Sequence, residues 1–259
     1  DPTFSIFKGK LTAEEKGILT TALATIGSFD GLDGFGWLDD LNKRLGLVEQ
    51  QPVIQLSKNL LENKTLMAEA FSAIQAHAVV KLQYKRFDAS HMCEVIISPY
   101  LLKEYNQRWY LIGAAYDTGR VLNFALDRLV SIAVLPGYEY RQAPADLLER
   151  YEDIVGITYY EGAQLYKIVF WVSDKSAPYV ATKPLHGSQI RYKGEREAAL
   201  RQQYQAPPQG ALFSIACMEN YELIRELCSY GGELKVLSPQ PIIDAVTSRI
   251  KEMATLYGL

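Results

Sequence analysis

The stretch Arg108-Trp109-Tyr110-Leu111-Ile112-Gly113 decides how the middle of this chain folds. Successive side chains of a β-strand point to opposite faces of the sheet, so Trp109 and Leu111 share one face and Tyr110 lies on the other. We expect Trp109 and Leu111 to lie in a core and the phenol of Tyr110 to lie outside it. The alternative is that all three side chains belong to the core, because aromatic residues are common in strands.

A second motif, Asn123-Phe124-Ala125-Leu126-Asp127-Arg128-Leu129, follows along the chain. In one interpretation its adjacent acid and base, Asp127 and Arg128, pair with one another or with backbone groups. In the other, Arg128 presents its guanidinium group, whose planar fork suits a phosphate. The residues alone leave both interpretations open.

Around these motifs, hydrophobic residues recur at every second position. Val80, Leu82 and Tyr84 alternate with polar residues, which predicts a half-exposed strand. Further strands are predicted at 93–98, 108–116, 120–125 and 129–135, and turn residues separate them at Pro99, Asn106 and Asp117-Thr118-Gly119. Short strands in such close succession predict a small barrel, in which the sheet closes on itself.

The C-terminal part alternates between strand and helix patterns. Strands are predicted near 165–172, 188–193, 211–217 and 233–237. Helices are predicted near 173–182, around Ile224 and Leu227, and around Ile243 and Val246. The resulting βαββαβ order is ferredoxin-like. The segment 194–210 contains Pro207-Pro208 and is predicted to be a flexible loop.

The first 75 residues carry helical patterns, among them a capping box formed by Thr12 and Glu15. A later helix is predicted around Leu66, Met67 and Ala70. We therefore expect an α+β protein in four parts. These are a helical linker or dimerisation segment at 1–75, the small barrel at 76–137, a linker at 138–160 and a ferredoxin-like domain at 161–259.

Composition argues against several classes of protein. The net charge of −3 does not suit a chain that binds polyanions by charge alone, and no apolar run approaches the roughly 20 residues of a membrane span. Three separated cysteines form no metal motif and predict a reduced, cytoplasmic protein without metal or cofactor, namely Cys93, Cys217 and Cys228.

No histidine lies near a nucleophile motif, so we expect no enzyme activity; the histidines are His77, His91 and His186. The chain opens on Asp1-Pro2 rather than on methionine, and we expect it to be a fragment of a longer protein.

The two motifs together resemble the WYL family, bacterial transcriptional regulators whose WYL domain senses a ligand. Ser98–Lys103 and Tyr84-Lys85-Arg86 add to the resemblance, which extends over residues 76–137. It implies an Sm-like or SH3-like barrel, followed by a C-terminal extension that residues 161–259 fit. Members usually carry a winged helix-turn-helix before the WYL domain. Residues 1–75 show no recognition helix, so we expect duplex DNA to be bound only through a missing N-terminal domain.

The resemblance also implies a groove of basic and aromatic residues that binds a nucleotide or single-stranded nucleic acid. Aromatic rings stack on bases, and cationic side chains neutralise phosphates. The residues that correspond in this sequence are Tyr84, Arg86, Tyr110, Asn123 and Arg128, with Lys85 and Arg108 as additional candidates. Ala125 and Glu94 stand where a basic residue is expected. These departures favour a small nucleotide over an extended strand.

Two functions follow from this reading. The first is the ligand-sensing part of a regulator that acts as a homodimer, since operators usually have two-fold symmetry. The second is a protein-interaction module without a small ligand. Arginines that converge beside Tyr110 favour the first, whereas arginines neutralised by Asp127 and Glu94 favour the second.

Overall fold

The computed structural model describes residues 12, 14, 15, 17–19, 22, 64–85 and 92–259. The fold is α+β, as predicted, and forms two compact units, Asp1–Ala143 and Pro144–Leu259. No helix within the described ranges is both long and apolar enough to cross a membrane.

The predicted capping box is confirmed. The backbone NH of Thr12 donates to the Glu15 carboxylate at 2.8 Å, and the backbone NH of Glu15 donates to the Thr12 hydroxyl at 3.2 Å.

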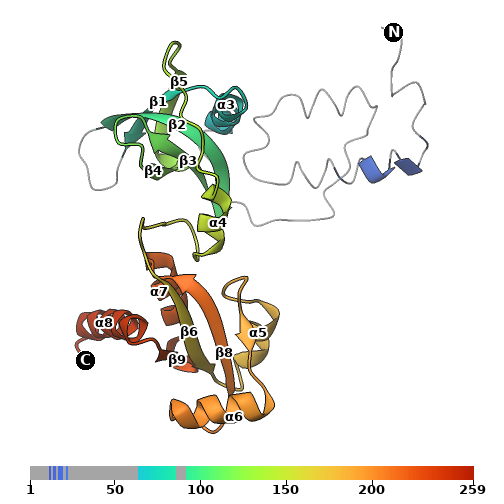
Figure 1. The fold of residues 1–259 in the computed structure, drawn as a ribbon, viewed down its shortest axis with the longest axis vertical. Helices are drawn as coiled ribbons and strands as arrows, with labels where there is room; N and C mark the ends of the chain where they lie inside the picture. The colour runs from blue at the N-terminus through green and yellow to red at the C-terminus, as the bar shows by residue number, and fades with distance from the viewer. Residues whose placement is uncertain (1–11, 13, 16, 20–21, 23–63, 86–91) are drawn as a thin grey trace. The chain divides into compact units, whose positions relative to one another are not determined.

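The first unit contains one antiparallel sheet with the strand order β4-β3-β2-β1-β5 (Figure 1). Its elements are α3 (Lys64–Gln75), β1 (Val80–Lys85), β2 (Met92–Tyr105), β3 (Arg108–Ala115), β4 (Val121–Ala125), the short 3-10 helix η2 (Leu126–Arg128) and β5 (Leu129–Val134). The strands lie close to where the alternating pattern placed them, except that β2 extends well beyond residue 98. Helix α3 packs against β2 and β5 through Leu66, Met67, Ala70 and Ala73.

The expected closure of this sheet into a barrel is not seen among the described strands, since β4 and β5 form its two edges. Strand β2 also continues past Pro99, where a break between strands was predicted. Its pairing with β3 shifts register between Pro99 and Leu101. Proline has no NH for the ladder, so a bulge lets the strand continue past it.

Gly113, which ends the first motif, allows β2 and β3 to approach closely at this bulge. A Cβ atom on Gly113 would lie 2.5 Å from the carbonyl oxygen of Ser98 and 3.0 Å from Cα of Pro99. Any side chain there would push the two strands apart, so the position requires glycine.

The second unit contains an antiparallel sheet with the strand order β7-β8-β6-β9. Its elements are α4 (Leu147–Glu152), β6 (Leu165–Val172), α5 (Ala177–Thr182), β7 (Ile190–Arg191), α6 (Gly194–Gln203), β8 (Ala211–Met218), α7 (Tyr221–Ser229), the 3-10 helix η3 (Gly231–Glu233), β9 (Leu234–Ser238) and α8 (Gln240–Leu256). The prediction that 194–210 is a flexible loop was wrong. Helix α6 occupies its first half and adds a helix to the predicted βαββαβ order.

Helices cover both faces of this sheet. One face packs on α5, α7 and α8 around Phe170 and Phe213, whose rings stack with centroids 5.7 Å apart. The other face packs on α6 and the chain that follows it, through Leu200, Tyr204 and Ala206. Few of the residues of α6 are large and apolar, so its sequence, GEREAALRQQ, carries only a weak helical stripe.

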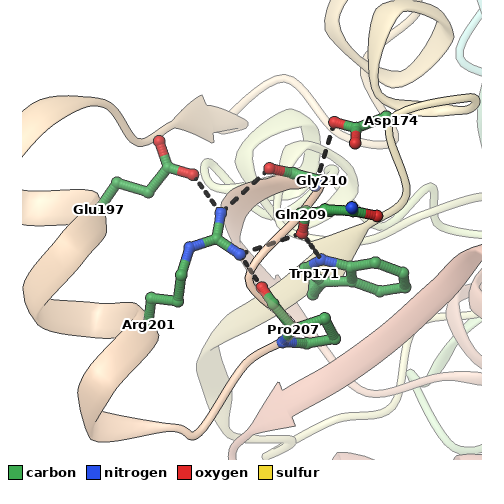
Figure 2. A network of polar contacts seen from close by, with 7 residues as sticks. All are labelled: Trp171, Asp174, Glu197, Arg201, Pro207, Gln209 and Gly210. Carbon is green, nitrogen blue, oxygen red and sulfur yellow. Dashed lines mark hydrogen bonds and ion pairs between the residues drawn. The ribbon is translucent and has the colours of Figure 1, made fainter.

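Arg201 of α6 fixes the loop that leads into β8 (Figure 2). Its guanidinium pairs with Glu197 at 2.6 Å and donates to the backbone carbonyls of Pro207, Gln209 and Gly210. The indole NH of Trp171 donates to the same Gln209 carbonyl at 2.6 Å. A guanidinium group offers five donors in one plane, so a single side chain can satisfy several loop carbonyls at once.

Candidate ligand-binding site

The first motif divides between the two faces of β3 as the alternation predicts. Leu111 is fully buried in the core of the first unit, and Trp109 packs against that core. Tyr110 is half-buried and lies opposite Ala125 of β4. Directly paired residues share a face of the sheet, so Tyr110 and Ala125 lie on the face opposite to Leu111 and its partner Phe124.

A row of polar and aromatic residues crosses β2, β3 and β4 on the Tyr110 face. Lys103 of β2 pairs with Tyr110, and Asn123 of β4 pairs with Ile112, two residues further along β3. Arg108 precedes Tyr110 by two positions and so points to the same face. The structure therefore brings together three predicted site residues, Arg108, Tyr110 and Asn123. Lys103 was not among the candidates, because the predicted strand ended before Pro99, although Lys103 lies in the Ser98–Lys103 stretch that adds to the family resemblance.

Tyr84 belongs to the core of the first unit. Its side chain is only 6% exposed, and its ring meets Phe124 edge-on with centroids 5.4 Å apart. The guanidinium of Arg128 lies over the Tyr84 ring, 5.1 Å from its centroid. This ring therefore supports Arg128 by a cation–π contact, and little of it is exposed for stacking on a base.

The pKa of Tyr84 is raised, chiefly because burial disfavours the phenolate. The positive charge of Arg128 and a backbone hydrogen bond with Ala125 oppose this rise, whereas Asp127 and Tyr110 add to it. The contact of its ring with Arg128 joins the end of β1 to η2.

Asp127 of η2 forms an ion pair with Arg108, the first residue of β3. Its Oδ2 atom lies 3.1 Å from Nε of Arg108, and both side chains are partly exposed. The other carboxylate oxygen, Oδ1, is buried and has no hydrogen-bond partner within the part of the chain that the structure describes. The acid of the second motif thus offsets a base of the first, which lowers the positive charge available to an anion.

The remaining candidates lie at the end of β1. Lys85 is exposed and pairs in register with Met92, and Arg86 lies outside the described residues. Glu94 forms an ion pair with Lys81 at 3.2 Å. Its charge is therefore directed at a lysine of the neighbouring strand β1.

A histidine and a serine meet in the second unit, at the loop before β7. Nδ1 of His186 lies 2.7 Å from Oγ of Ser188. The same Oγ bonds both backbone groups of Ala216, accepting from its NH at 2.8 Å and donating to its carbonyl at 3.0 Å. Ser188 thus completes the hydrogen bonding along β8. That the chain is not an enzyme stays a prediction.

The fold and this face define a two-domain α+β protein with a cationic and aromatic surface on its first sheet. The WYL domain matches residues 65–134, and the WCX domain matches residues 164–254. The chain therefore carries a WYL domain followed by a WCX domain. No curated protein matches it.

Two solved structures are similar to the chain. Proteasome accessory factor B/C (PafBC) of Arthrobacter aurescens is 19% identical over 91% of this chain and 36% of its own, with a TM-score of 0.30. A CRISPR Cas-related protein is 12% identical over 76% of this chain and 52% of its own, with a TM-score of 0.44. The chain thus spans about a third and about half of these two proteins.

Proposed function

We propose that this chain is the ligand-sensing regulatory part of a bacterial, cytoplasmic WYL-type transcriptional regulator. The succession of a WYL and a WCX domain supports the regulatory class. The observation that carries the binding site is the row of Lys103, Arg108, Tyr110 and Asn123 on one face of the sheet. The ion pair of Arg108 with Asp127 joins this row to η2, in which Arg128 follows Asp127. Cations beside a half-exposed aromatic ring are the elements that recognise phosphate and base together.

A nucleotide suits this face better than a long single strand does. Asp127 takes up part of the charge of Arg108, and Glu94 takes up that of Lys81. An extended strand needs a series of cations along its backbone, because affinity grows with each neutralised phosphate. A mononucleotide or dinucleotide needs only the cluster around Arg128 and Tyr110.

The ligand would act through the connection between β4 and β5. Arg128 lies in η2, which links these two edge strands. A ligand held by Arg128 would therefore contact the segment that sets their relative position. A ligand shifts such an equilibrium only if it binds one arrangement more tightly. In a homodimer that binds duplex DNA through an N-terminal domain, this preference would change the spacing of the DNA-binding parts.

The test is a binding screen of the whole chain against nucleotides, cyclic dinucleotides and short single-stranded DNA and RNA. Tyr110→Ala and Arg128→Ala are measured beside Arg225→Ala, which removes an exposed arginine of α7 in the second unit. We expect a nucleotide to bind and both site variants to lose about tenfold or more in affinity, as for one charged contact. Unchanged nucleotide affinity in both variants would contradict the assignment of the site to Tyr110 and Arg128.

The second candidate function is a protein-interaction module without a small ligand. The ion pair between Arg108 and Asp127 favours it, because a motif arginine that is already neutralised can be purely structural. A folded chain that binds nothing in the screen would support this alternative over the proposed sensor.

A further inference from the structure

A hollow of about 560 Å³ opens in the second unit, between the start of β6, the N-terminal end of α7 and the middle of α8. Its size lies within the range of small-molecule sites. None of the candidate residues from the motifs lines it. It belongs to the second unit alone, so it is distinct from the face around Tyr110.

The sheet itself creates this hollow. Strand β8 pairs with β6 from Leu165 to Val172, but β9 pairs only with Val169–Val172. Strand β9 ends at Ser238 and the chain turns into α8 at Gln240. The side of β6 near Tyr166 is therefore bordered by helices instead of a strand, and α7 and α8 form the walls.

Three tyrosines line the hollow. Tyr166 forms part of its lining on β6 and packs against the buried core, whereas Tyr160 and Tyr221 are 53% and 52% exposed beside it. Exposed aromatic rings around a concave site offer apolar area with little conformational entropy to lose. They suit an apolar or aromatic group of a ligand.

The charged residues of the hollow have opposite signs and lie close together. The guanidinium of Arg249 lies over the ring of Tyr221, 5.4 Å from its centroid, and its Nη1 is 3.7 Å from Oε2 of Glu252. That distance is longer than a hydrogen bond, and such an exposed pair exchanges partners at little cost. Glu219 adds a second carboxylate to the lining.

We propose that this hollow binds a free amino acid with an aromatic or large apolar side chain. An α-amino acid carries a carboxylate and an ammonium group on one carbon atom, so it can bind the adjacent Arg249 and Glu252 together. The tyrosines would contact its side chain. A nucleic acid is disfavoured because Glu219 and Glu252 repel phosphates. This site is independent of the proposed nucleotide site.

The test titrates the whole chain with each of the common L-amino acids, and with the amide and the N-acetyl derivative of any that binds. We expect an aromatic or large apolar amino acid to bind, and the loss of either charge to weaken binding about tenfold or more. If the amide and the N-acetyl derivative bind as tightly as the free amino acid, the proposal is wrong. It is also wrong if the folded chain binds no amino acid at all.

Variants locate the site. Arg249→Ala and Glu252→Gln are expected to weaken amino-acid binding about tenfold, whereas Arg225→Ala, outside the hollow, leaves it unchanged. Tyr110→Ala tests whether the two sites are independent, since it should weaken nucleotide binding about tenfold or more and leave amino-acid binding unchanged. Affinity that is unaffected by both Arg249→Ala and Glu252→Gln contradicts the location. Loss of amino-acid binding in Tyr110→Ala would contradict a second site that is independent of the first.

Discussion

Asp127 and Arg108 form an ion pair that joins the two motifs, with Oδ2 of the acid 3.1 Å from Nε of the base. Arg108 begins β3 and Asp127 lies in η2, so the pair connects a strand to the segment that carries Arg128. An anion bound at Arg108 must compete with Asp127. The Asp127 carboxylate therefore competes with the proposed ligand for Arg108.

Removing this competitor should strengthen nucleotide binding. Asp127→Asn keeps the shape of the side chain and removes its charge, and we expect affinity to rise several-fold, since exposed ion pairs contribute up to about 1 kcal/mol. Calorimetric titration with the best-binding nucleotide measures the change. Asp117→Asn, in the exposed turn after β3, is the matched control. Weaker binding in Asp127→Asn than in that control would show that Asp127 supports the site.

Tyr84 and Tyr110 should differ in what they contribute. Tyr84 is buried in the core and touches Phe124, so Tyr84→Ala should cost about 3–5 kcal/mol of unfolding free energy, as large aromatic truncations do. Tyr110→Ala should cost clearly less unfolding free energy and should weaken nucleotide binding about tenfold or more. Urea denaturation of both variants gives the comparison. Equal destabilisation by the two would mean that Tyr110 is also a core residue.

Gly210 should tolerate no side chain. Its φ is +82°, and a Cβ atom would lie 2.3 Å from the carbonyl oxygen of Val172 and 2.5 Å from Nε1 of Trp171. We expect Gly210→Ala to destabilise the second unit by about 1–3 kcal/mol, through strain and loss of the Trp171 bond. Gly187→Ala, where the space is open, should be nearly neutral. Thermal unfolding compares the two.

Tyr151 should make stability depend on pH in alkaline solution. Burial raises its pKa to about 12, against the opposing charge of Arg150. The unfolded phenol ionises near pH 10 and the folded one about two units higher, so unfolding releases a proton between these values and stability falls as pH rises. The full effect is on the order of 2–3 kcal/mol.

Tyr151→Phe removes the ionisable group and keeps the ring, so its urea midpoint should fall less than that of the wild type between about pH 9 and 11. Identical pH profiles for the two proteins would mean that Tyr151 ionises as readily in the folded chain as in the unfolded one.

Alternation along the strands was enough to predict much of the first unit. It placed Leu111 inside and Tyr110 on the opposite face, and it set Tyr84 in line with Val80 and Leu82, which are both buried. The burial of Tyr84 was therefore visible in the sequence, although the resemblance to the WYL family assigned it to the ligand.

Other features depend on contacts between distant segments. Helix α6 has a weak apolar stripe and is fixed by Arg201 and by packing on Leu212, neither of which a local pattern reveals. The ion pair of Arg108 with Asp127 and the hollow beside Arg249 arise from the same kind of long-range placement. Pro99 ended a predicted strand because a local rule cannot show that the neighbouring strand accommodates a bulge.

The most direct test of the sensing account is the salt dependence of nucleotide binding by the whole chain and by Arg128→Ala. Affinity for a ligand held through its phosphates falls as salt rises, with a slope that reflects the number of neutralised phosphates. We predict salt-sensitive binding in the wild type, and weaker binding with a shallower slope in the variant. Binding with the same affinity and the same slope in both proteins would contradict a phosphate site at Arg128.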